Sequence, residues 1–245
     1  MLKMINISKS FAGVSVLRKI SLTIAQNTIT AIVGPNGAGK TTLFDVISGF
    51  VRAEEGQVFL QGRELTGLDP YERSRQGLAR TFQQVKFAEN LSIRDHFEFL
   101  RDHEDEHVFA SAVIPTRATE KLESQYAAHL ASWAVAKPLT TRIADLSYGQ
   151  RKLLDLGFAV FRKHKVLLLD EPVAGVNQVV RKTIHTLLKQ LKLAGETVVL
   201  IEHDIDFVRA LADGVVVLDE GRILTHGEPQ KVFADSRVME AYLGK

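Results

Sequence analysis

The residues with the clearest chemical meaning form a glycine-rich segment from Gly34 to Thr41, which reads G-P-N-G-A-G-K-T. Glycines permit backbone conformations in which consecutive N–H groups turn toward one anion, and a helix that follows adds its positive end. An apolar run at 29–33 precedes the segment, and helix-forming residues follow from Thr42. This pattern predicts a phosphate-binding loop between a strand and a helix.

The last two side chains of this loop have predicted roles of their own. Lys40 lies where its ammonium group would reach the β- and γ-phosphates of a nucleotide. Thr41 lies where its hydroxyl would bind Mg²⁺, which prefers octahedral oxygen ligands and keeps waters at its remaining positions. The segment therefore indicates a nucleotide site with a magnesium ion rather than a glycine-rich turn without a ligand.

Polar side chains also follow two apolar strands later in the chain. Asp170 and Glu171 end a strand predicted at 166–169, and His203 follows a strand predicted at 197–201. Polar residues at the carboxyl ends of parallel strands lie where such sheets bind ligands. Phosphoryl transfer to water requires neutralised charge and one oriented water, and a carboxylate beside the γ-phosphate suits that task. The alternative is a set of structural polar residues at the strand ends.

The composition limits the classes of protein that fit. The chain has 245 residues, of which 45% are hydrophobic, enough for a packed α/β domain. Its net charge of +2 gives no long-range field for nucleic acid, so we expect no nucleic-acid partner. The absence of cysteine excludes disulfides, thiolate zinc sites and a cysteine nucleophile. No signal peptide is expected, and no uncharged apolar run approaches the ~18 residues that a membrane span requires.

The elements that must position these residues alternate between strands and helices. Residues 3–8 and 20–24 have strand patterns separated by a turn at 11–13, which predicts an antiparallel hairpin. The ring of Phe11 in that turn could stack on an adenine or belong to the core. The alternation that follows predicts an α/β fold with a largely parallel sheet. Further strands are expected at 58–60, 215–218 and 222–225, and helices at 70–76, 147–160 and 178–194, with two short helices at the end.

Strand patterns are absent between residues 87 and 144, where two helices are predicted. A capping box at 92–95 opens the first helix, and the second runs from Arg117 to about Ala136. The run 101–107 between them mixes histidines and carboxylates, which is more typical of a solvated loop than of a metal site. This part of the chain is expected to be a helical insert.

Taken together, these motifs follow the order found in one known family. After the phosphate loop come Gln83, the run Leu146-Ser147-Tyr148-Gly149-Gln150, the pair Asp170-Glu171 and His203. In this order the sequence resembles ATP-binding cassette (ABC) ATPases over nearly its whole length. The run at 146–150, the signature motif of that family, is the most specific part of the resemblance, because an acidic strand end marks P-loop NTPases in general.

The resemblance implies a P-loop NTPase-type core of largely parallel sheet, an N-terminal antiparallel β subdomain and an inserted α-helical subdomain. A single domain is expected over residues 1–245, with the nucleotide-binding core at 1–86 and 146–245 and the insert at 87–145. Within the family the chain looks like the ATP-binding subunits of branched-chain amino acid importers, and relatives that move urea or short amides share much of the pattern. The segments that carry this closer match are 79–83, 146–150, 174–177, 201–208 and 241–244.

The resemblance also assigns roles residue by residue. Glu171 would polarise the attacking water, and His203 would contact the γ-phosphate and hold the water and Glu171 in place. Phe11 would stack on the adenine of ATP, and Mg²⁺ would be held by Thr41, Gln83 and Asp170. The residues expected to bind the cofactor ATP are Phe11, Val16, Gly34, Asn36, Gly37, Ala38, Gly39, Lys40, Thr41, Thr42, Gln83, Ser147, Gly149 and Gln150.

A second ATPase subunit is implied, either an identical copy or a related chain. In the family, the residues equivalent to Ser147 and Gly149 clamp the γ-phosphate that the opposing subunit holds. A ligand shared in this way stabilises association, and hydrolysis releases it. One departure is Asn177, where most of the family has aspartate, which leaves the dimer-crossing contact at this position open.

The other implied partners are integral membrane permease subunits and, indirectly, a substrate-binding protein. The subunit would then be cytoplasmic and peripheral on the inner face of the cell membrane. The insert would carry the coupling surface, because the apolar faces at Phe97, Phe99 and Trp133 exceed what two helices need for themselves. Two other functions are a non-transport ABC ATPase with a soluble macromolecular partner and a scaffold without turnover. The single unsplit cassette argues against the first, and the presence of Glu171 and His203 argues against the second.

Overall fold

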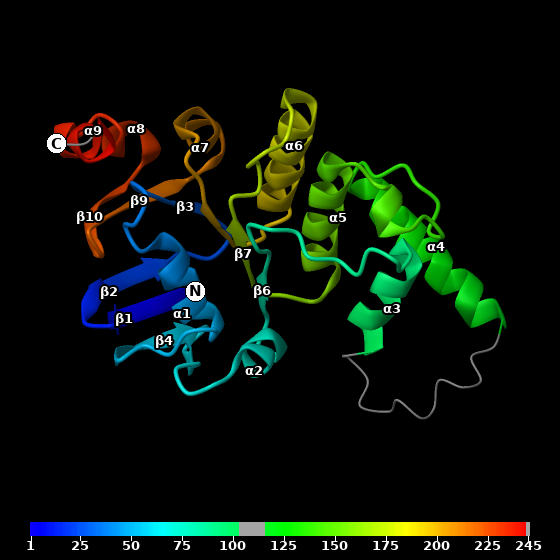
Figure 1. The fold of residues 1–245 in the computed structure, drawn as a ribbon, viewed down its shortest axis with the longest axis horizontal. Helices are drawn as coiled ribbons and strands as arrows, with labels where there is room; N and C mark the ends of the chain where they lie inside the picture. The colour runs from blue at the N-terminus through cyan, green and yellow to red at the C-terminus, as the bar shows by residue number, and fades with distance from the viewer. Residues whose placement is uncertain (103–115, 244–245) are drawn as a thin grey trace. The chain divides into compact units, whose positions relative to one another are not determined.

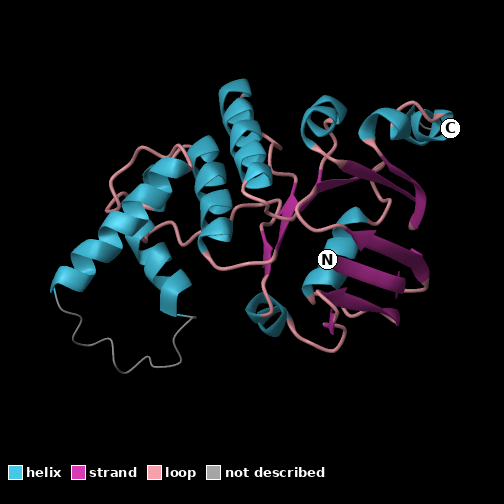
Figure 2. Cartoon of the chain, turned by 180° about the vertical axis from the view of Figure 1, so that it is seen from behind, coloured by secondary structure: helices cyan, strands magenta, loops and turns pink. Residues whose placement is uncertain are grey.

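The chain forms two compact units, and each is described by itself. The computed structural model describes residues 1–102 and 116–243, drawn along the chain in Figure 1 and by secondary structure in Figure 2. Most of the run at 101–107 therefore lies outside the described residues. The boundaries expected for the insert, at 87 and 145, stay a prediction. The first unit comprises Met1–Phe82, His164–Pro172 and His185–Lys245, and the second comprises Gln83–Lys163 and Val173–Ile184.

An antiparallel sheet forms the start of the first unit. Its strand order is β2-β1-β4-β5, with β1 and β2 joined as the predicted hairpin, which is confirmed. Phe11 pairs with Val14 and is the last residue of its strand rather than part of the turn. The bounds are β1 Leu2–Phe11, β2 Val14–Ile24, β4 Glu55–Leu60 and β5 Arg63–Glu64.

A six-stranded sheet supports the predicted site. Its order is β10-β9-β3-β8-β7-β6, and only β10 pairs antiparallel with its neighbour. Every residue of β3, β7 and β8 is buried, as expected for strands covered on both faces. The predicted α/β class with a largely parallel sheet is confirmed. The bounds are β3 Ile29–Val33, β6 Leu78–Arg80, β7 Val166–Asp170, β8 Val198–Ile201, β9 Gly214–Asp219 and β10 Arg222–Gly227.

The helices of the first unit begin and end at residues with clear local causes. Helix α1 (Lys40–Ser48) lies between Gly39 and Gly49, which both adopt left-handed conformations. Helix α2 (Pro70–Arg75) begins at a capping box made by Asp69 and Glu72. The remaining helices are α7 Ile205–Leu211, α8 Pro229–Val232 and α9 Ser236–Leu243, and α6 (Gln178–Leu193) passes from the second unit into the first.

The second unit contains α3 (Ile93–Asp102), α4 (Thr116–Ser132) and α5 (Tyr148–Phe161). The predicted capping box at α3 is confirmed, because the Asp95 N–H donates to Ser92 Oγ at 3.2 Å and the Ser92 N–H donates to Asp95 Oδ2 at 2.8 Å. Helix α4 ends at Ser132 rather than near Ala136. The reason is local, since Ala134 has a φ of 57° and turns the chain out of the helix.

Aromatic side chains fill the core of the second unit. Phe97 is fully buried, and its ring stacks on Tyr126 with centroids 4.6 Å apart. The rings of Phe158 and Phe161, from α5, pack edge-on against it. Trp133 is also buried. The interpretation of Phe97 and Trp133 as part of a partner surface is therefore wrong, and only Phe99 among the three aromatics is exposed.

No helix within residues 1–102 and 116–243 combines the length and the apolar character that crossing a bilayer requires.

Asp155 in α5 gives a test of the packing of the second unit. Burial raises the pKa of its carboxyl to about 7, although the charge of Lys152 lowers it. Because the folded pKa lies above the unfolded value of 3.8, the protein loses stability as pH rises between these two values. We expect Asp155→Asn to raise the midpoint of thermal unfolding by roughly 2–8 °C at pH 8 and by much less at pH 5.

Differential scanning calorimetry at the two pH values measures this difference. Asp145→Asn is the matched control, because Asp145 is exposed and its substitution should shift the midpoint little at either pH. Equal shifts at pH 5 and pH 8 for Asp155→Asn would contradict a raised pKa for this carboxyl.

Candidate nucleotide-binding site

The predicted phosphate loop joins the end of β3 to the start of α1 in the first unit (Figure 1). Gly34, Gly37 and Gly39 have φ values of 149°, 81° and 98°, in the region that favours glycine. A Cβ at Gly34 would collide with the carbonyl oxygen of Leu218, and one at Gly39 would lie 2.8 Å from that of Val16. The loop therefore requires glycine for space as well as for conformation.

The ammonium group of Lys40 lies inside this loop. Lys40 is 6% exposed, and its Nζ donates to the carbonyl oxygens of Gly34 and Pro35, each at 2.8 Å. Burial lowers the pKa of Lys40, while the charges of Glu171 and Asp170 act in the opposite direction. These two carboxylates are therefore close enough to act on the loop electrostatically. A positive charge enclosed by turned backbone suits an anionic phosphate chain.

Asp170 ends β7 with its two carboxylate oxygens in different environments. Its Oδ2 accepts a hydrogen bond from the guanidinium of Arg80 at 3.3 Å. Its Oδ1 is buried and has no hydrogen-bond partner within the described residues. Burial raises the pKa of Asp170, and Arg80 lowers it. A buried, unpartnered carboxylate oxygen beside a phosphate loop fits a hard cation such as Mg²⁺, with Thr41 in the first turn of α1 as a further oxygen donor.

The structure brings the two predicted catalytic residues together. His203 Nε2 lies 3.0 Å from Glu171 Oε1, because β7 and β8 are neighbours, Glu171 directly follows β7 and His203 lies two residues after the end of β8. Glu171 has a φ of 49°, an uncommon conformation for a residue other than glycine. Its N–H donates to the carbonyl of Ile201 at 3.1 Å. The hydrogen-bonded pair thus holds a carboxylate at the sheet edge that carries Asp170.

Phe11 lies at the surface rather than in the core. Its side chain is 45% exposed, and the ammonium of Lys9 lies 5.1 Å from the centre of its ring. The structure therefore contradicts the core alternative, and stacking on an adenine stays a prediction. A ring with a cation on it and with free surface is compatible with stacking on a nucleotide base.

The signature residues lie in the second unit, at the start of α5. The Gln150 N–H donates to Ser147 Oγ at 3.3 Å, and the Ser147 N–H donates to Gln150 Oε1 at 3.0 Å. This capping box leaves the exposed Ser147 fixed at a helix N-terminus, which favours anions. A Cβ at Gly149 would lie 2.7 Å from Val180, so the approach of α6 requires glycine.

Gln83 is also in the second unit and is exposed. Its backbone carbonyl oxygen accepts a hydrogen bond at 3.2 Å from the ammonium of Lys152, a buried residue of α5. The first unit therefore brings the phosphate loop, Asp170, Glu171 and His203 together, and the second unit holds the predicted residues Gln83, Ser147, Gly149 and Gln150.

Sequence reasoning missed several contacts around these residues. Asn177 Oδ1 accepts the Val180 N–H at 3.0 Å and so caps α6, a task that asparagine performs as well as aspartate. The Tyr148 hydroxyl donates to the carbonyl of Ala174 at 3.4 Å. Asn177 before a helical pattern is a readable cap signal. Neither the Tyr148 contact nor the partners of Arg80 had a signal in the sequence, because both join segments far apart in the chain.

Comparison with known proteins leads to the family that the sequence motifs resemble. Residues 17–174 match a family model described as ABC transporter. The chain is 32% identical to the probable branched-chain amino acid transport ATP-binding protein LivG of Archaeoglobus fulgidus, over 98% of this chain and 93% of that protein. It is 30% identical to the high-affinity branched-chain amino acid transport ATP-binding protein BraF of Pseudomonas aeruginosa, over 100% and 98% of the two chains.

A solved structure supports the assignment at the level of the fold. The crystal structure of the ADP conformation of an ATP-binding cassette of an ABC transporter matches with a TM-score of 0.84 and 30% identity, over 100% of this chain and 99% of that one. The chain therefore belongs to the ABC transporter family. The resemblance inferred from the motifs is confirmed, and both relatives, LivG and BraF, are ATP-binding proteins of branched-chain amino acid transport.

We expect Lys40→Ala to abolish ATP binding, because it removes the fixed positive charge from inside the phosphate loop. Isothermal titration calorimetry with Mg²⁺ present measures the affinity. Lys231→Ala is the matched control, since Lys231 is exposed and pairs with Glu228 in the same unit. Unchanged affinity in a folded Lys40→Ala protein would contradict the site.

Proposed function

We propose that this chain is the ATP-hydrolysing subunit of a membrane importer for branched-chain or related amino acids. The observation that carries the hydrolytic part is the hydrogen bond between His203 and Glu171, whose carboxylate acts electrostatically on Lys40. A protein that only bound ATP would not need an oriented carboxylate at this point. The names of the LivG and BraF relatives support the substrate class.

The site residues of the first unit have separate roles in the proposed hydrolysis of ATP. Lys40 and the backbone N–H groups of the loop bind the β- and γ-phosphates and neutralise charge. Thr41 and Asp170 hold the magnesium ion, which supplies further charge neutralisation when it is bound. Glu171 orients the attacking water and accepts its proton, and His203 keeps the Glu171 carboxylate in place.

The signature residues Ser147 and Gly149 of the second unit serve a facing subunit in this proposal. Ser147 at the N-terminus of α5 presents a hydroxyl and a helix dipole, which suit the γ-phosphate of ATP held by a second ATPase chain. Gln83 contacts the magnesium ion and the attacking water in this proposal. ATP then closes the pair, hydrolysis opens it, and separate permease subunits at the inner face of the membrane use the movement for transport.

Glu171→Gln tests the proposed hydrolysis. The substitution keeps the size of the side chain and its hydrogen-bonding reach but removes the negative charge that orients water. Phosphate release should fall by roughly 10²–10⁴-fold, whereas calorimetry should show ATP still bound. Glu228→Gln, at an exposed glutamate of the same unit, is the control and should keep the wild-type rate. A wild-type rate in Glu171→Gln would remove Glu171 from the mechanism.

The same variant tests the proposed substrate class in the native host. Replacement of the wild-type chain by Glu171→Gln should stop the uptake of a labelled branched-chain amino acid and leave the uptake of labelled urea unchanged. Loss of urea uptake alone would reassign the importer, and unchanged uptake of both would contradict a role in their transport.

A further inference from the structure

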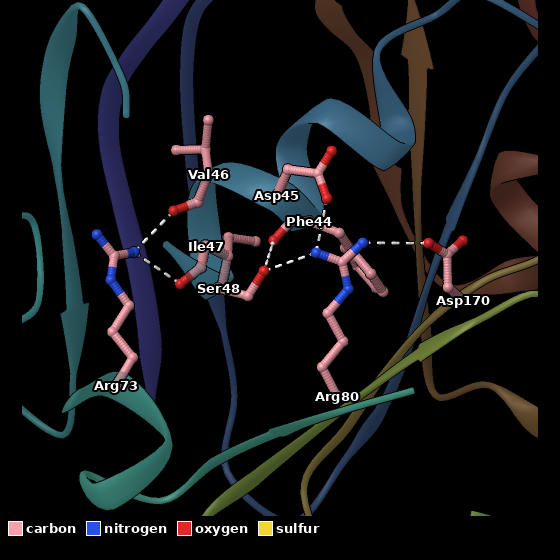
Figure 3. Close-up of polar contacts among 8 residues, drawn as sticks. All are labelled: Phe44, Asp45, Val46, Ile47, Ser48, Arg73, Arg80 and Asp170. Carbon is pink, nitrogen blue, oxygen red and sulfur yellow. Dashed lines mark hydrogen bonds and ion pairs between the residues drawn. The ribbon is translucent and has the colours of Figure 1, made fainter. Parts of the chain in front are cut away.

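The guanidinium of Arg80 is a buried charge to which the proposed function gives no role. Arg80 ends β6, its side chain is 5% exposed, and Figure 3 shows it between α1 and the end of β7. One terminal nitrogen donates to Asp45 Oδ1 at 2.8 Å and to Ser48 Oγ at 2.6 Å. The other donates to Asp170 Oδ2 at 3.3 Å. The side chain of Arg80 therefore connects α1, the helix that follows the phosphate loop, to the carboxylate of Asp170.

Aromatic rings fix the position of this guanidinium. The centroids of the Phe44, Phe50 and Phe82 rings lie 5.6, 5.8 and 4.8 Å from its central carbon. Aromatic faces attract a cation, and they also keep water away from it. Because the planar fork of arginine is held by rings and by oxygen acceptors, it has little freedom to turn. A lysine at this position would keep the charge but lose the fork.

The contact with Arg80 places the two carboxylate oxygens of Asp170 in different hydrogen-bonding environments. The terminal torsion of a carboxylate is broad, so an unsupported Asp170 would sample many orientations. Arg80 holds Oδ2, and Oδ1 is the buried oxygen without a hydrogen-bond partner in the part of the chain that the structure describes. The arrangement fixes which oxygen is satisfied within the protein and which is left for a ligand.

We propose that Arg80 is a positioning residue for Asp170, which it ties to Asp45 and Ser48 of α1 so that Oδ1 stays available to the magnesium ion. The proposal rests on the proposed magnesium-dependent binding of ATP and adds a residue that acts through a metal ligand. Partners that orient metal ligands from behind typically change metal affinity by about 10–100-fold when they are removed.

Arg73 provides a matched comparison within the same unit. It is 3% exposed and, like Arg80, it donates to the C-terminal turn of α1 (Figure 3). Its guanidinium donates to the backbone carbonyls of Val46 and Ile47 at 2.7 Å each, and to those of Leu68 and Thr66. These four acceptors are all uncharged. Removing Arg73 should therefore cost stability without disturbing Asp170.

The test measures how much Mg²⁺ increases the affinity for ATP, as the ratio of the dissociation constant in EDTA to that in excess Mg²⁺. Arg80→Gln should lower this ratio by about tenfold. Arg73→Gln should lower the midpoint of thermal unfolding but keep the wild-type ratio. Arg80→Lys keeps a charge, so it provides a folded variant if Arg80→Gln does not fold, and its ratio should fall to an intermediate value.

A double-mutant cycle shows whether Arg80 acts through Asp170. Asp170→Asn should lower the ratio by itself, and adding Arg80→Gln or Arg80→Lys to it should cause no further loss. A wild-type or increased ratio in a folded Arg80 variant would overturn the proposal, as would an equal further loss in the Asp170→Asn background. If the wild-type protein bound ATP equally well with and without Mg²⁺, the proposed function would fail instead.

Discussion

The ammonium group of Lys40, hydrogen-bonded to the carbonyls of Gly34 and Pro35, is the interaction on which the rest of the site depends. It closes the loop around a positive charge, and three glycines with positive φ make that closure possible. The backbone of Leu218 and Val16 leaves no room for a side chain at Gly34 or Gly39. Strands from both sheets, β2 with Val16 and β9 with Leu218, thus lie against the loop and restrict its shape.

Charge balance explains why carboxylates and cations are grouped around the phosphate loop. Three carboxylates, those of Asp45, Asp170 and Glu171, lie around two fixed cations, Lys40 and Arg80. Buried charges are costly unless they are paired and hydrogen-bonded. The fully buried oxygen of Asp170 is not paired within the described residues, and a magnesium ion would supply both the missing charge and the missing partner.

Local signals made much of this structure predictable from the sequence. The phosphate loop is a pattern of eight consecutive residues, and the caps at Asp69, Ser92 and Ser147 each depend on a residue three positions later. The hairpin follows from alternating apolar residues on both sides of a turn. In all these cases the cause lies within a few residues, so the sequence alone was sufficient.

Contacts between distant segments were not predictable in the same way. The assignment of Phe97 and Trp133 to a surface fails because their partners in α5 lie far along the chain. The short elements β6 and α7 carry too few residues for a periodic pattern. Arg80 has partners on α1 and at the end of β7, and the left-handed backbone of Glu171 is set by its neighbours rather than by its own residue type.

The most direct test of this account is a crystal structure of the protein with Mg²⁺ and a non-hydrolysable ATP analogue. The account predicts that Lys40 Nζ leaves the carbonyls of Gly34 and Pro35 for oxygens of the β- and γ-phosphates. It also predicts that Asp170 keeps its bond to Arg80 through Oδ2 and faces the magnesium ion with Oδ1. A nucleotide bound away from the loop, with Lys40 still on its two carbonyls, would contradict the account.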